Sequence, residues 1–245
     1  MRPGIEVKNK FQFTKDVSVF TSFSASTRPH LHHAFEIVVS QQIFSVVIGE
    51  RRLRVRGVLI RPDIVHSIGS KSLTISIYFE AHSNLGRAVL QSLGGRQTIQ
   101  LRGTQIREIL DFFKLPITAG ESMPFLETKL VGKVLMTGSS NNIDLRIKRV
   151  MDYIDQTFVK KTDFATIRTI ACLSESRLIH LFKMEVGIPI RNYITWRRLQ
   201  EVIRLVGDGH NLSTAAHKGG FTDAAHLNRA FVAAFGLNPS AVLRK

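Results

Sequence analysis

The sequence predicts an α+β fold in two parts, a β-rich N-terminal domain and a helical C-terminal domain. Short runs rich in β-branched and aromatic residues, several alternating with period two, fill residues 11–80. From Asn84 onward, apolar residues recur at helical spacing. The small polar stretch 137–142 has the composition of a linker. We therefore expect domains over residues 1–136 and 143–245.

The N-terminal domain is expected to be a barrel or sandwich, because many short strands separated by turns are typical of these folds. Gly49, Gly57 and Pro62 separate the strand-like runs at turn-like intervals. Three later segments are each able to carry the apolar stripe of a helix. The strand-like runs are 35–39, 43–48, 52–56 and 73–79, and the helical segments are 85–93, 105–115 and 124–135.

An apolar set in the later helices of this domain has two interpretations. It suits helix pairing in a homodimer, and it equally suits packing on the β domain, so both remain open. The set consists of Leu101, Ile106, Ile109, Leu110, Phe112 and Phe113.

The C-terminal domain contains two similar helix pairs, the first at residues 167–183. We expect Ser174 to cap the second helix of this pair, with its hydroxyl accepting a backbone N–H. Two helices joined by a tight turn, the second with a polar outer face, match the helix-turn-helix pattern. The inner residues are Ile167, Ile170 and Ala171 on the first helix, and Leu178, Leu181 and Phe182 on the second.

The second pair follows about 48 residues later. Thr222 or Asp223 caps its second helix, and residues 219–221 (Gly-Gly-Phe) form the turn, where glycine permits the backbone angles required. The inner residues are Leu212, Ala215 and Ala216 on the first helix, and Leu227, Ala230, Phe231, Ala234 and Phe235 on the second.

A single helix is expected to connect the two units. In residues 190–206 the apolar stripe lies on one side around Tyr193 and on the opposite side around Val202. An ordinary surface helix keeps one stripe along its length. A stripe that changes sides indicates a helix bridging two separate small cores.

These motifs together resemble the AraC/XylS class of transcription regulators over about 85 residues. The resemblance implies a C-terminal domain of about seven helices, with two recognition helices in successive major grooves about 34 Å apart. Cys172 departs from the family, which often has glycine there. The matching segments are Ser174-x-x-x-Leu178-x-x-Leu181-Phe182-Lys183, Gly187-Ile188-Pro189, Tyr193-Ile194, Arg198-Leu199, Gly220-Phe221, Asn228-Arg229-Ala230-Phe231 and Phe235-Gly236-Leu237-Asn238-Pro239-Ser240.

The outer faces of the two recognition helices supply the candidate DNA contacts. Arg229 is suited to a bidentate pair with guanine or to a phosphate, and Ile179 to a thymine methyl. For each residue the alternative is a solvated helix face without a partner. The candidates are Ser176, Arg177, Ile179, His180 and Lys183 on the first helix, and Thr222, Ala225, His226 and Arg229 on the second.

A histidine cluster marks the N-terminal domain. His30-x-His32-His33-x-x-Glu36, followed by His66, resembles the metal-binding pattern of cupins, and the AraC class commonly carries a cupin-like sensing domain. Imidazole and carboxylate are suitable ligands for a divalent metal. His30, His32, Glu36 and His66 are therefore candidates for an effector or a metal, although no metal or other cofactor is firmly predicted.

The composition agrees with a regulator that binds DNA. The net charge of +15, spread over both halves of the chain, favours anionic partners. One cysteine, no signal-peptide pattern and no long apolar run favour a reducing, cytoplasmic location near the nucleoid, without a membrane.

The expected partners are promoter DNA, RNA polymerase, a small-molecule effector and a second copy of the chain. We expect a regulator that is not an enzyme. The alternatives are a metal-binding cupin enzyme fused to a DNA-binding domain, and a basic nucleic-acid binder without sequence preference.

Overall fold

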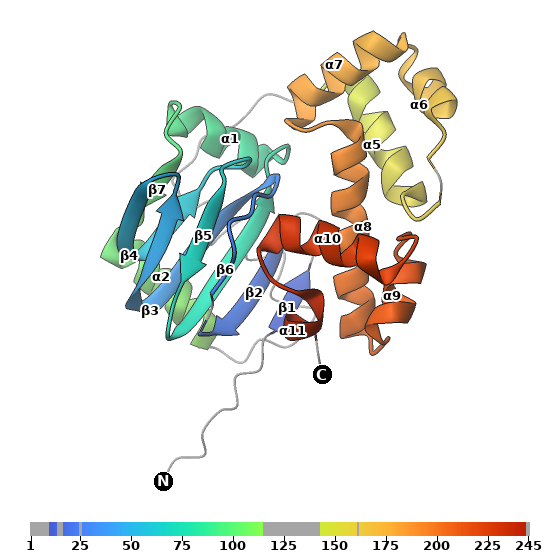
Figure 1. The fold of residues 1–245 in the computed structure, drawn as a ribbon. Helices are drawn as coiled ribbons and strands as arrows, with labels where there is room; N and C mark the ends of the chain where they lie inside the picture. The colour runs from blue at the N-terminus through green and yellow to red at the C-terminus, as the bar shows by residue number, and fades with distance from the viewer. Residues whose placement is uncertain (1–9, 14–16, 25, 115–142, 161, 244–245) are drawn as a thin grey trace.

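The computed structural model describes residues 10–13, 17–24, 26–114, 143–160 and 162–243 (Figure 1). An antiparallel sheet with two helices forms the N-terminal part, and helices alone form the C-terminal part. This arrangement confirms the predicted α+β fold class. The predicted linker 137–142 and the predicted helix 124–135 lie outside the described residues.

One seven-stranded sheet, ordered β1-β2-β6-β3-β4-β7 with β5 paired to β3, forms the N-terminal domain. β3 is the longest strand, because the two predicted runs 35–39 and 43–48 join into one. Its register with β4 shifts between Val39 and Phe44, and β6 pairs with its first part whereas β5 pairs with its last part. The strands are β1 (Lys10–Phe13), β2 (Val17–Phe23), β3 (Ala34–Ile48), β4 (Arg51–Ile60), β5 (His66–Gly69), β6 (Leu73–Glu80) and β7 (Thr98–Gln100).

The helices α1 (Asn84–Leu93) and α2 (Gly103–Lys114) share a core with one face of this sheet. Ile106 and Ile109 of α2 are buried there beside strand residues such as Ile37. Packing on the β domain therefore accounts for the apolar set that suited helix pairing.

The glycines of β3 and β4 play different roles. Gly49 lies in the β3–β4 turn with φ +56°, as predicted. Gly57, in contrast, lies inside β4, so its predicted role as a turn residue is wrong. A Cβ at Gly57 would lie 2.6 Å from Cγ1 of Ile106, and glycine is therefore needed for the close approach of α2.

Seven helices lie within the described part of residues 143–243, in agreement with the family resemblance. None of the described helices is long and apolar enough to cross a membrane. The helices are α5 (Leu145–Thr157), α6 (Phe164–Ala171), α7 (Glu175–Val186), α8 (Ile190–Gly207), α9 (Leu212–Lys218), α10 (Ala224–Phe235) and α11 (Pro239–Val242).

The long helix α8 bridges two cores, as the change of apolar face predicted. Tyr193 and Ile194 are buried with α5, α6 and α7. Val202 and Ile203, further along α8, are buried with α9 and α10. The second core also contains Phe20, Ala34 and Tyr78 of the β domain, so the second helix pair packs directly on the sheet.

Candidate functional site

The first helix-turn-helix unit consists of α6, a turn at Cys172 and the recognition helix α7. Cys172 ends α6 in a left-handed conformation with φ +51°, which explains why glycine is common in the family at this position. Ser174 is the N-cap residue of α7, as predicted. Its side chain makes no capping hydrogen bond, however, so that part of the prediction is wrong.

The second unit consists of α9, a glycine turn and the recognition helix α10. Asp223 is the cap, with its carboxylate accepting the backbone N–H of His226 at 2.7 Å. Gly220 has φ +85°, and a Cβ there would lie 2.7 Å from the carbonyl oxygen of Val159. Arg198 of α8 donates to the carbonyls of Phe158 and Lys160, which holds the end of α5 near this turn.

The predicted DNA contacts lie mostly on exposed surface. All five candidates of α7 are exposed, and so are Thr222, Ala225 and Arg229 of the second unit. His226 is half-buried: its ring packs on Phe221 with centroids 5.1 Å apart, and its Nδ1 lies 3.2 Å from the hydroxyl oxygen of Thr222. The outer face of α7 also includes Met184, 63% exposed, one turn after His180. Its spacing of four residues from His180 was the sequence signal for it.

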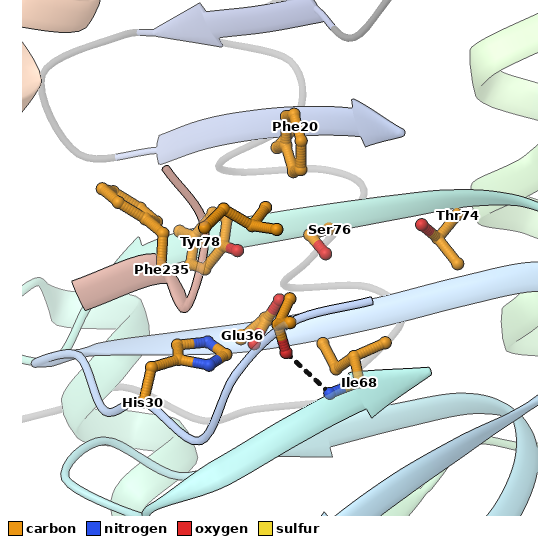
Figure 2. A pocket seen from close by; sticks show the side chains of 10 residues that line it. Phe20, His30, Glu36, Ile68, Thr74, Ser76, Tyr78 and Phe235 are labelled. Atoms are coloured by element: carbon orange, nitrogen blue, oxygen red, sulfur yellow. Dashed lines mark hydrogen bonds between the residues drawn. The ribbon is translucent and has the colours of Figure 1, made fainter. Parts of the chain in front are cut away.

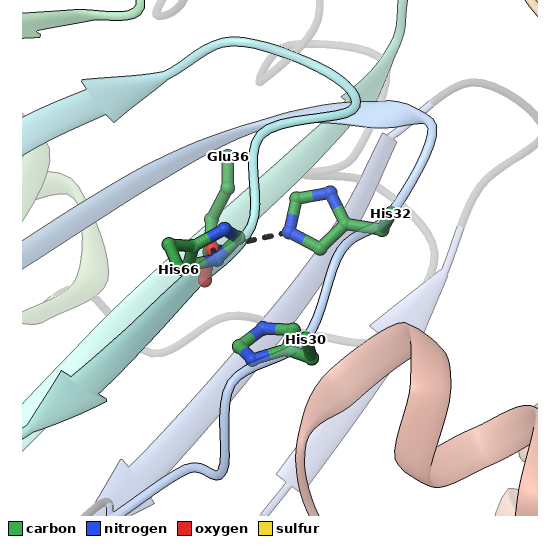
Figure 3. Close-up of side chains that lie close together, drawn as sticks. All are labelled: His30, His32, Glu36 and His66. Carbon is green, nitrogen blue, oxygen red and sulfur yellow. Dashed lines mark hydrogen bonds and ion pairs between the residues drawn. The ribbon is translucent and has the colours of Figure 1, made fainter. Parts of the chain in front are cut away.

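The structure also brings together the four residues of the histidine cluster (Figure 3). His30 and His32 lie between β2 and β3, Glu36 lies on β3, and His66 begins β5. All four are buried, and one potential ligand atom from each lies within 4.8 Å of the others. The backbones of His30 and His66 exchange two hydrogen bonds of 2.9 Å, which fixes their spacing.

Hydrogen bonds orient the rings of the histidine cluster. Nδ1 of each histidine lies 2.8–2.9 Å from a backbone carbonyl oxygen, those of Arg28, Ala34 and Ile64 respectively. A carbonyl only accepts, so each Nδ1 carries the hydrogen. Nε2 of His32 and of His66 lies 3.2 and 2.9 Å from Oε2 of Glu36.

The cluster is strongly coupled electrostatically. Burial alone would raise the pKa of Glu36, but the hydrogen bonds with His32 and His66 outweigh burial and hold this pKa well below its ordinary value. Burial lowers the pKa of His30 to about 3, with the neighbouring His66 and His32 acting in the same direction. His66 has a raised pKa because contact with Glu36 outweighs the opposing effect of burial.

A small cavity of about 10 Å³ adjoins the cluster (Figure 2). His30, Glu36 and Tyr78 line it from the β domain, and Phe235 and Leu237 line it from the C-terminal domain. A cavity of this size holds about one water molecule. The end of α10 therefore covers the cluster side of the sheet.

Further contacts join the two domains, and the sequence patterns did not reveal them. Glu80 of β6 accepts hydrogen bonds from Nε1 of Trp196 at 2.8 Å and from Nε2 of Gln200 at 2.9 Å. The backbone N–H groups of Arg28 and Leu31 donate to the carbonyls of Gly236 and Ala233.

Comparison with known proteins agrees with this architecture. Residues 168–245 match a family described as a helix-turn-helix domain. Over 146 residues the chain is 26% identical to the probable transcriptional regulator LumQ of Photobacterium leiognathi, which covers 59% of this chain and 57% of LumQ. Over 103 residues it is 30% identical to the arabinose operon regulatory protein of Escherichia coli K12, which covers 40% of this chain and 34% of that protein. The alignments thus span about half or less of these relatives.

The fold is similar to that of apo ToxT from Vibrio cholerae, with a TM-score of 0.63 at 14% identity, covering 94% of this chain and 97% of the ToxT chain. The matched domain and the paired units place this chain among the helix-turn-helix DNA-binding proteins. Within that class it belongs with the AraC-type transcription regulators, which confirms the resemblance found in the sequence.

Proposed function

We propose that this protein is a sequence-specific transcription regulator that places α7 and α10 in successive major grooves on one face of DNA. The observation that carries the proposal is the pair of exposed recognition faces, each built on its own core and both held by α8. A helix of 18 residues is about 27 Å long, comparable to one turn of DNA at about 34 Å.

We propose that a small organic effector binds between the domains. A cleft of about 330 Å³ lies there, which is within the usual range for ligand sites. Leu31 and His33 line it from the β domain, and Asn192, Thr195 and Trp196 line it from α8. One ToxT structure of this fold is described as bound to an unsaturated fatty acid, and the mixed lining here suits an amphipathic molecule.

A regulatory role, without catalysis, fits the histidine cluster best. The adjoining cavity of about 10 Å³ has no room for an organic substrate, because it holds about one water molecule. The cupin-enzyme alternative requires a substrate to reach these ligands.

The proposed partners are promoter DNA, a second copy of the chain and RNA polymerase, all in the cytoplasm. A dimer would engage paired half-sites and gain affinity by linking two binding events. Sedimentation with and without a selected site measures this state directly.

Selection of binding sites from random DNA with the full chain, followed by footprinting at two salt concentrations, tests the main proposal. Two protected blocks about one helical turn apart on one face would support it. Binding without an enriched motif, collapsing as salt rises, would instead identify a non-specific binder.

Trp196 gives a direct test of the effector site, because it is the only tryptophan and it lines the cleft. Titration with unsaturated fatty acids should change its fluorescence saturably. Asn192→Ala should weaken this response, whereas Asn84→Ala, at the start of α1, should leave it unchanged. A flat titration in the wild-type chain would contradict the effector proposal.

A further inference from the structure

We propose that a divalent transition-metal ion bound by His30, His32, Glu36 and His66 locks the C-terminal end of the second recognition helix, α10, onto the β domain. Three imidazole nitrogens and one carboxylate oxygen suit zinc, iron(II), nickel or copper. The binding step concerns the β domain alone, whereas its consequence for DNA binding rests on the proposed function.

The spacing of the four residues fits one ion. Zn–N and Zn–O bonds are about 2.0–2.2 Å, so ligand atoms on opposite sides of an ion lie up to about 4.2 Å apart. The ligand atoms here already lie within 4.8 Å of one another. Closure by about half an ångström therefore completes coordination, a shift that side-chain rotation supplies.

The hydrogen bonds around the cluster orient the rings for a metal. Metal-binding histidines usually donate their second ring N–H to a carbonyl or carboxylate. All three Nδ1–H groups do so here, which leaves Nε2 of each ring as the nitrogen with a free lone pair. Glu36 keeps Oε1 buried without a hydrogen-bond partner among the described residues.

The charges at the cluster also favour a cation. Two Nε2 atoms lie against the same carboxylate oxygen of Glu36. These contacts set lone pairs against lone pairs unless a positive charge lies between them. A metal ion supplies that charge, and burial strengthens its attraction to Glu36.

The ligand His30 touches the end of α10. Arg28, two residues before His30, donates its backbone N–H to the carbonyl of Gly236 at 2.9 Å, and Leu31, one residue after it, donates to Ala233 at 3.2 Å. A Cβ at Gly236 would lie 2.6 Å from Nδ1 of His30 and 2.4 Å from the carbonyl oxygen of Arg28. Fixing His30 by a metal bond therefore fixes the surface on which α10 ends.

The first experiment measures metal binding by the full chain in the absence of DNA. Chelator-treated protein is titrated with Zn²⁺ and with Co²⁺, and bound metal is counted after gel filtration. We expect one ion per chain and a rise in unfolding temperature on metal addition. His66→Gln and Glu36→Gln should lower the affinity at least about a hundredfold, since even outer partners of a metal ligand contribute about 10- to 100-fold.

His33→Gln is the matched control, because His33 is next to His32 but pairs with Asp63 outside the cluster. It should leave metal binding unchanged. A folded wild-type chain that binds no stoichiometric metal would overturn the proposal, and so would equal affinity in His66→Gln. Specific DNA binding without metal binding would refute this inference alone, and metal binding without DNA specificity would refute the proposed function alone.

The second experiment tests the link to α10. Gly236 and Gly187 both end recognition helices with positive φ, +66° and +89°, so alanine strains both positions. Only at Gly236 does the added Cβ meet the β domain, since nothing lies within 4 Å of a Cβ at Gly187. We expect Gly236→Ala to weaken metal binding about tenfold and Gly187→Ala to leave it unchanged.

Hydrogen exchange of the wild-type chain provides a readout that does not depend on the folding of any variant. Zinc should slow exchange in residues 224–235 of α10 and leave residues 175–186 of α7 unaffected. Equal metal affinity in Gly236→Ala and Gly187→Ala, or no metal effect on exchange in α10, would overturn the proposed lock.

Discussion

At the scale of single residues, Cys172 has a backbone conformation that glycine adopts more easily. It ends α6 with φ +51°. A left-handed conformation costs a residue with a Cβ roughly 1–2 kcal/mol. We expect Cys172→Gly to raise the free energy of unfolding by up to about 1 kcal/mol, because greater flexibility of the unfolded chain offsets part of the gain. Urea unfolding of the full chain measures this change.

Cys172→Ala is the control for the lost thiol. It keeps a Cβ and therefore keeps the strain, so its stability should stay close to that of the wild-type chain. If alanine stabilised the chain as much as glycine, the thiol and not the backbone would be the cause.

Arg229 offers a second test at this scale, because it is exposed on the outer face of α10. Arg229→Ala should weaken binding to a selected site by about 1–3 kcal/mol and relax the preference at one base position if the side chain reads a base. Binding to a library of single-base variants measures both effects.

The exposed Arg54 of β4 supplies the matched control for Arg229, since Arg54→Ala removes the same charge from the other domain. Little change is expected there. An equal loss for Arg229→Ala on every sequence would assign Arg229 to a phosphate instead of a base.

At the scale of elements, period and turn chemistry predicted most of the described helices and strands, because burial of one face leaves a local pattern. The stripe that changes sides in residues 190–206 is such a pattern, and α8 does bridge two cores. The role of Gly57 was not predictable in this way. It depends on Ile106, a residue 49 positions away that no local pattern connects to it.

The two cores on α8 allow the recognition helices to be disturbed one at a time. Leu178 is fully buried in the first core and Leu227 almost fully in the second. Truncation of a buried leucine to alanine costs about 2–5 kcal/mol. We expect Leu178→Ala to speed hydrogen exchange in α6 and α7, and Leu227→Ala to speed it in α9 and α10.

Footprinting should follow the same division, with one protected block weakened in each variant. Exposed Leu145, 68% accessible at the start of α5, provides the control, and Leu145→Ala should change neither unit. Uniform acceleration of exchange across both units by Leu178→Ala would show that the two cores unfold together.

At the scale of the whole molecule, the sequence predicted the members of the histidine cluster but not their relation to the C-terminal domain. The spacing of His30, His32 and Glu36 follows from one short segment. The contact of His30 with Gly236 joins residues about 200 positions apart, and it depends on how two domains dock. Docking is set by shape and by a few polar contacts, and neither produces a periodic signal in the chain.

Glu80 is the polar centre of this docking, since one carboxylate oxygen accepts from both Trp196 and Gln200. Glu80→Ala leaves the buried Trp196 N–H without this acceptor, which costs about 1–3 kcal/mol. We expect lower stability and a red-shifted Trp196 emission, because water gains access to the indole. Glu50→Ala, in the exposed turn between β3 and β4, should change neither quantity. An unshifted emission in a folded Glu80→Ala chain would mean that apolar packing of Phe20, Ala34 and Tyr78 holds the domains together without this carboxylate.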